Sequence, residues 1–165
     1  MPVSARLRSA MDLLSRATAP LALAVTLLLC LQWPLRDAVA AGATQANDLA
    51  QWLFALYVAV AVRHAGRRGA HLVARPDLVH ADGRGGALRR LGAALCVLPW
   101  SLFVALSAWP MVQASVRGLE RFPETADPGY FLVKAALLLL AALLALQSLL
   151  DCADALADWR RAKEV

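Results

Sequence analysis

Uncharged, mostly apolar runs alternate with charged segments along the chain. Residues 17–35 carry no charge over 19 positions and would extend about 28 Å as a helix. The hydrocarbon core of a bilayer is about 30 Å thick, and a helix needs about 20 apolar residues to cross it. Residues 91–116 carry no charge over 26 positions, which exceeds that length and predicts tilt or bending. These two runs predict the first and third of four membrane-spanning helices.

Two shorter runs reach the length of a crossing when one charged residue is placed at the membrane surface. Residues 49–62 follow Asp48, and residues 135–150 follow Lys134, whose long side chain reaches the interface from within a helix. We therefore expect an all-α integral membrane protein that forms a single domain over residues 1–165. Its predicted transmembrane helices cover about residues 17–36, 44–63, 91–116 and 130–151.

The composition supports a membrane location. The 165 residues are 60% hydrophobic and 18% charged, with a mean hydropathy of +0.56. Soluble domains are nearer 45–50% apolar and about 25% charged, and one of this size buries only roughly 70% of the surface that its unfolded chain exposes. The composition therefore argues against a soluble enzyme and a disordered tail.

The first apolar run also allows a second interpretation, a cleaved signal peptide. Arg6, Arg8 and Arg16 precede it, and Ala38-Val39-Ala40 resembles a cleavage site. However, the uncharged stretch is longer than the 7–15 apolar residues of a typical signal peptide, and Arg36-Asp37 separates it from the candidate site. We favour a retained transmembrane helix, with the cleaved leader as the alternative.

The distribution of positive charge predicts the orientation. The net charge is +5, and thirteen of the 17 Lys and Arg residues lie before the first span, in the loop of residues 63–90, or after the fourth span. Only Arg36, Arg117, Arg121 and Lys134 lie on the other side. By the positive-inside rule, both termini and the 63–90 loop are cytoplasmic, and the 117–134 loop is periplasmic. The basic residues thus indicate topology and contact with membrane lipid, not a nucleic-acid partner.

No residue pattern predicts catalysis or a bound cofactor. Cys30, Cys96 and Cys152 are widely spaced and odd in number, which argues against a disulfide framework or a zinc site. The three histidines, His64, His71 and His80, lie at a span end or in the basic loop, outside the positions that an axial haem ligand requires. Three aspartates, Asp151, Asp154 and Asp158, lie at the end of the fourth span, and we expect Asp158 to pair with Arg161. The protein is therefore predicted not to be an enzyme.

The apolar runs also suggest how the helices pack. Pro99 and Pro110 predict a bend in the third span, because each removes a helical hydrogen bond. Small residues recur on one face of each of the last two spans, and such faces let membrane helices approach closely. These residues are Gly92, Cys96, Pro99, Ser107, Pro110 and Ala114 (interrupted by Phe103), and Ala141, Ala145, Ser148, Cys152 and Ala155.

The order of motifs resembles the small permease subunit of TRAP transporters, the DctQ-type component of tripartite ATP-independent periplasmic systems. The resemblance covers roughly residues 11–158. It rests on Met11 to Arg16, on Asp48 with Trp52 and Phe54, on Leu98-Pro99-Trp100, Trp109-Pro110, Ser115, Glu120, Asp127-Pro128-Gly129, Lys134 and Gln147, and on the loop histidine His71. The chain departs from the family pattern after His71, at Tyr130, and at Val116, where a tryptophan is frequent.

The resemblance implies a non-catalytic subunit in the inner membrane of a bacterium. Such subunits accompany a large permease that carries the solute and sodium sites, while a periplasmic solute-binding protein delivers an organic acid. The chain itself then needs no cofactor, and its 117–134 loop is expected to help dock the binding protein. Family motif positions with an expected interface role are Asp48, Trp52, His71, Trp109, Pro110, Ser115, Glu120, Asp127, Gly129, Lys134 and Gln147.

Two other classes remain open at this stage. One is a non-catalytic anchor or accessory subunit of another membrane complex, for example a respiratory complex. The other is a small membrane enzyme, which requires an ionisable pair inside a span.

Overall fold

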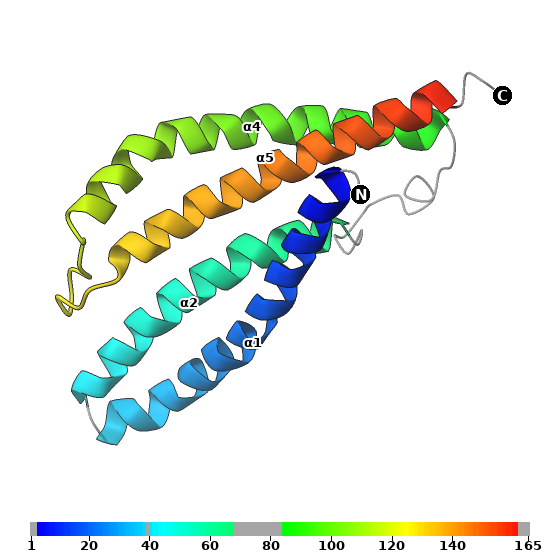
Figure 1. Ribbon diagram of the computed structural model, residues 1–165. Coiled ribbons are helices and arrows are strands. Elements are labelled where there is room, and N and C mark those ends of the chain that lie inside the picture. The colour runs from blue at the N-terminus through cyan, green and yellow to red at the C-terminus, as the bar shows by residue number, and fades with distance from the viewer. Residues whose placement is uncertain (1–2, 39, 68–83, 162–165) are drawn as a thin grey trace.

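The computed structural model describes residues 3–38, 40–67 and 84–161 of the chain (Figure 1). Four long helices make up almost all of this part: α1 (Val3–Ala38), α2 (Ala40–Arg67), α4 (Arg84–Arg117) and α5 (Tyr130–Arg161). Each contains a stretch that is long and apolar enough to cross a membrane, and no strand is formed within the described ranges. The prediction of an all-α protein with four transmembrane helices is confirmed.

The helices extend beyond the spans predicted from the sequence. α2 continues to Arg67 and α4 already begins at Arg84, so both ends of the predicted 63–90 loop are helical. Arg63, Arg89 and Arg90 therefore stand on helices. The first charge after an apolar run marks where lipid ends, but arginine, alanine and leucine favour helix equally well in water. Charge and helix boundaries are separate properties here.

The helices are arranged as a row in the order α4, α5, α2, α1 (Figure 1). Helices that follow one another in the sequence run in opposite directions, so the neighbours α5 and α2 run parallel. Both ends of the chain lie at one end of the molecule, and the 118–129 loop between α4 and α5 lies at the other. The first half of α1 also reaches α5, because Met11 shares a buried cluster with Val60, Leu143 and Leu150. α5 is thus the central helix.

Small residues form the interface between α4 and α5. Five of the buried positions on α4 recur at intervals of seven residues: Ala87, Ala94, Ser101, Ala108 and Ser115. On α5 the same interval separates Ala141, Ser148 and Ala155, which are also buried. A seven-residue repeat keeps one face of a helix against a gently supercoiled partner, and small side chains allow the backbones to approach closely.

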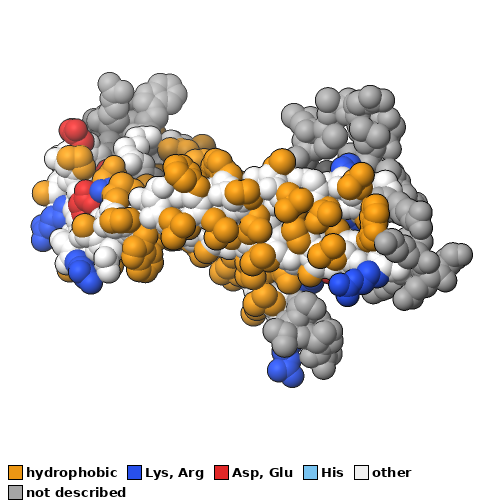
Figure 2. All heavy atoms as spheres, turned by 90° about the horizontal axis from the view of Figure 1, so that it is seen from above, with side chains coloured by type: hydrophobic (Ala, Val, Ile, Leu, Met, Phe, Trp, Pro, Cys, Tyr) orange, Lys and Arg blue, Asp and Glu red, His pale blue; other side chains and the backbone are white. Residues whose placement is uncertain are grey.

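The two small-residue faces predicted from the sequence have different fates. The α5 face is largely buried inside the molecule, as expected of a packing surface. The predicted α4 face, from Gly92 to Ala114, is instead exposed, and a neighbouring face of α4 packs on α5. An alanine-rich helix carries more than one such row, so spacing alone did not select the correct one. Figure 2, which looks onto the side where α4 lies, shows apolar side chains along the middle and charged ones toward the ends.

α4 is one continuous helix despite Pro99 and Pro110. Figure 1 shows it curving toward its C-terminal end, the part that contains Pro110. This agrees with the bend expected where proline removes a helical hydrogen bond.

Candidate functional site

The 118–129 loop begins with a compact helix stop at the end of α4. The Glu120 N–H donates to the Ser115 carbonyl at 3.0 Å, and the Leu119 N–H donates to the Val116 carbonyl at 3.2 Å. Leu119 adopts a φ of 44°, the left-handed conformation that this pair of hydrogen bonds requires. The reversal places Glu120 back beside the last turn of α4.

The middle of the loop folds on itself. The Phe122 N–H donates to the Asp127 carbonyl and the Ala126 N–H donates to the Phe122 carbonyl, both at 2.9 Å. The Arg121 guanidinium also donates to the Ala126 carbonyl at 3.2 Å. The loop backbone therefore satisfies much of its own hydrogen bonding, which gives the segment a defined shape without a strand or helix.

One hydrogen bond ties this loop to α2. The Thr125 hydroxyl donates to the Asp48 carboxylate, which is only 7% exposed, and the Asp127 N–H donates to the Thr125 hydroxyl at 3.3 Å. Asp48 and Thr125 are 77 residues apart in the sequence. Because a buried carboxylate requires hydrogen-bond donors, Asp48 holds the loop in a fixed position against α2.

Aromatic side chains form the floor beneath the end of the loop. Phe122 is buried and meets Tyr130 edge to face, with ring centroids 5.4 Å apart. Gly129 has a φ of 137°, and a Cβ at this position would lie 3.5 Å from the Phe122 ring and 3.7 Å from the Trp52 ring. The backbone conformation therefore requires glycine, and the lack of a side chain leaves the loop close to both rings.

Glu120 joins α4 to α5. Its carboxylate oxygen Oε2 accepts a hydrogen bond from the Ser115 hydroxyl and one from Lys134 Nζ at 2.5 Å. Lys134 Nζ also lies 5.0 Å from the centre of the Tyr130 ring, within cation–π distance. One carboxylate thus links the last turn of α4 to the first turn of α5.

The hydrogen bonds from Lys134 and Ser115 lower the pKa of Glu120 below its ordinary value of 4.5. Because the folded pKa lies below the unfolded one, the ionised group stabilises the loop above about pH 4.5, and this contribution is lost as the pH falls through the lowered value. We expect carboxylate ¹³C titration to show this lowered pKa and Lys134→Met to raise it toward 4.5. Arg121→Gln, in the same loop, is the control and should leave it in place. An unchanged Glu120 pKa in Lys134→Met would contradict this assignment.

The structure gathers most of the residues singled out from the sequence at this end of the molecule. We call the group the loop cluster: Asp48, Trp52, Ser115, Glu120, Asp127, Gly129 and Lys134. Trp109 and Pro110 lie apart from it, exposed on α4. Gln147 lies far along α5 in a different cluster, and His71 is outside the described residues.

A second polar cluster surrounds the buried Arg63 among α1, α2 and α5, and the sequence did not predict it. Arg63 is 1% exposed; its Nη1 donates to the Asp12 carboxylate and its Nε donates to the Gln147 carbonyl oxygen, each at 3.3 Å. Gln147 in turn donates to Asp151 at 2.7 Å. We call these residues the Arg63 cluster. They connect three helices with one guanidinium.

Arg63 was missed because it directly follows an apolar run and was counted with the basic loop. Its position in the helix could have indicated its burial. On a helix that continues to Arg67, residue 63 lies on the same face as the buried Val60. The acidic end of α5 also differs from the expectation. Asp158 accepts from Arg90 of α4 at 2.6 Å, and Asp154 accepts from Arg8 of α1 at 2.5 Å. The side chain of Arg161, the partner expected from the sequence, lies outside the described part.

Both clusters join separate helices through hydrogen bonds and ion pairs, and the loop cluster also fixes the 118–129 loop. Within the described part of the chain, no group of three or more His, Cys, Asp or Glu side chains is placed to hold a metal ion. Comparison with known proteins adds no relative: no family model, curated protein or solved structure matches the chain. The geometry and the sequence resemblance therefore carry the functional argument.

Proposed function

We propose that this chain is the small membrane subunit of a TRAP-type secondary transporter. The observation that carries the proposal is the loop cluster. Residues from three separate segments of the sequence, selected because they resemble family motifs, converge on one loop and its two supporting helices. Motif residues that lie together in space can serve one interface, which gives a reason for these motifs to occur in the same chain.

In this proposal the subunit supports a large permease that uses the energy of an ion gradient to take up an organic acid. Both termini face the cytoplasm of a bacterial cell, and the loop cluster faces the periplasm, where it meets the solute-binding protein. The asymmetry of basic residues supports this orientation. The defined backbone of the 118–129 loop suits it for recognition, because a pre-organised loop loses little entropy on binding.

The exposed face of α4 is the surface that the proposal assigns to the large permease. It carries large apolar side chains such as Leu106, which is 75% exposed, beside the small residues from Gly92 to Ala114. Small residues flanked by large ones allow a neighbouring membrane helix to approach closely. α5 covers the opposite face of α4, so the outward face is available to a partner.

The test is co-purification of the tagged chain from its native membranes. We expect a large multi-span permease to be recovered with it. Gly92→Leu should reduce that recovery severalfold, because a Cβ there meets nothing within 4 Å in this chain but obstructs a close partner. Gly85→Leu, equally unobstructed at the first turn of α4, is the control. Recovery of a homo-oligomer alone, or a purified complex with a haem absorbance band, would overturn the proposal.

A further inference from the structure

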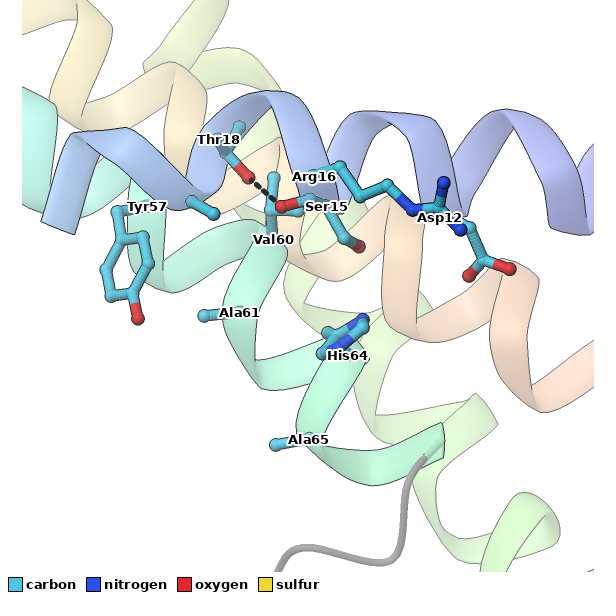
Figure 3. Close-up of a pocket in the computed structure, with 10 residues that line it drawn as sticks. Asp12, Ser15, Arg16, Thr18, Tyr57, Val60, Ala61, His64 and Ala65 are labelled. Carbon is cyan, nitrogen blue, oxygen red and sulfur yellow. Dashed lines mark hydrogen bonds between the residues drawn. The ribbon is translucent and has the colours of Figure 1, made fainter.

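A groove lies between α1 and α2, near the end of the molecule where both termini lie (Figure 3). Its volume is about 710 Å³, within the 300–1,000 Å³ range of small-molecule sites. The α1 wall includes Arg16 and Ser15, and the α2 wall includes Ala61 and His64. The groove is separate from the loop cluster, which lies at the opposite end.

The groove is placed where a membrane surface meets its hydrocarbon core. Arg16 immediately precedes the uncharged run of α1, and Arg63 immediately follows that of α2. These residues therefore stand at the depth of lipid headgroups, whichever side of the membrane this end faces. From His64 to Tyr57 the groove follows α2 for about 10 Å toward the membrane interior.

Its polar end offers a positive charge and a histidine nitrogen that have no partner among the described residues. Arg16 is exposed and forms no hydrogen bond or ion pair with any residue that the structure describes. His64 Nδ1 is buried and likewise has no partner there. The carboxylate of Asp12 also lines the groove, but it accepts a hydrogen bond from Arg63, which offsets its charge.

The remaining lining fits a lipid with hydroxyl groups on its headgroup and an acyl chain below. The Ser15 hydroxyl donates its own proton to the Met11 carbonyl at 3.0 Å, so its oxygen is left as an acceptor. Deeper in the membrane the walls are formed by Ala19, Val60 and Ala61 together with Thr18 and Tyr57. The Thr18 hydroxyl donates to carbonyls of its own helix, so this part of the groove is mostly apolar. A charged end at headgroup depth followed by a mostly apolar groove matches the two halves of a phospholipid.

We propose that this groove binds an anionic phospholipid of the phosphatidylglycerol type. The phosphodiester lies against Arg16 and His64, a headgroup hydroxyl donates to Ser15, and the start of an acyl chain lies over Ala61. The Arg16 guanidinium selects the anionic headgroup, because phosphate forms charge-assisted hydrogen bonds with arginine. This inference depends on the membrane location of the chain and not on its transport role.

The test measures lipid retained by the full-length protein after purification from vesicles of equimolar phosphatidylglycerol and phosphatidylcholine. Native mass spectrometry should find phosphatidylglycerol preferentially bound to the wild type. Arg16→Gln should weaken this binding at least about tenfold, as expected for loss of a charge-assisted hydrogen bond. Arg6→Gln removes the same charge ten residues earlier on α1, outside the groove, and should retain the preference.

Equal binding by the two variants would overturn the proposal. A second measurement addresses a protein occupant. Ala61→Cys, in a background without the three natural cysteines, should be shielded by lipid in native membranes and should not cross-link to another polypeptide. An efficient cross-link from residue 61 to a second chain would show that the groove is a protein interface and would refute the lipid assignment.

Discussion

Replacing Arg63 with leucine should lower the free energy of unfolding by about 1.5–3 kcal/mol, the contribution of hydrogen bonds to a charged group, because only the arginine of this ion pair is fully buried. The variant would leave Asp12 without this cation and the Gln147 carbonyl oxygen without the donor that now reaches it. Gln147 is 8% exposed, so its carbonyl oxygen gains little from water, whereas the Asp12 side chain is 34% exposed and is partly hydrated. Among the described residues, Arg63 is the one fully buried charged side chain that joins α2 to both α1 and α5.

Thermal or denaturant unfolding of the purified protein in detergent would measure this loss. Arg90→Leu is the matched control, because Arg90 also binds an aspartate of α5 but both side chains of that pair are at least 40% exposed. Exposed pairs contribute about 0–1 kcal/mol, so the control should change stability little. Replacing Arg63, Asp12 and Gln147 together by leucine should recover part of the loss, since the Asp12 carboxylate and the Gln147 carbonyl oxygen are then absent, while Asp151, which loses the Gln147 donor, is only half-buried. Equal effects of Arg63→Leu and Arg90→Leu would contradict the argument.

The fold was predictable because it depends on lengths and averages. The sequence contains four uncharged runs that are long enough to cross a bilayer, separated by charged segments. Because backbone hydrogen bonds must be satisfied inside each span, such runs form helices, and consecutive helices cross the membrane in opposite directions. The order of the helices in the row was not accessible in the same way. It depends on which of several small-residue rows on α4 fits α5, and the rows that contain Ala94 and Gly92 are both made of small residues.

The loop cluster was accessible only as a list of residues. The predicted topology places Asp48 and Gly129 on the same side of the membrane, but nothing in the sequence showed that the helices that follow them lie side by side. That proximity follows from the parallel course of the neighbouring helices α2 and α5 and from the reversal at Leu119. The partner of Asp48, Thr125, was not identified, because a threonine in a polar loop carries no pattern that distinguishes a structural hydroxyl from a solvated one.

Replacing Thr125 with valine should release the 118–129 loop from α2. Valine keeps the shape of threonine but removes the hydroxyl, so the buried Asp48 carboxylate loses its donor and the Asp127 N–H loses its acceptor. A hydrogen bond to a charged group contributes about 1.5–3 kcal/mol, which corresponds to an increase of about tenfold or more in loop opening. Hydrogen–deuterium exchange should therefore quicken by that factor at the Phe122 and Ala126 amides, whose N–H groups are hydrogen-bonded within the loop.

A double variant and a control variant distinguish the loss of this hydrogen bond from a general disturbance of the loop. Asp48→Leu combined with Thr125→Val should exchange more slowly than Thr125→Val alone, because it removes the unpaired carboxylate that makes the single variant costly. Glu124→Gln changes an exposed neighbour and should alter exchange less than about twofold. If the loop receives the solute-binding protein, uptake should fall in Thr125→Val and recover partly in the double variant, in the same order as the exchange rates. Faster exchange in the double variant than in the single one would show that Asp48 stabilises the loop through something other than Thr125.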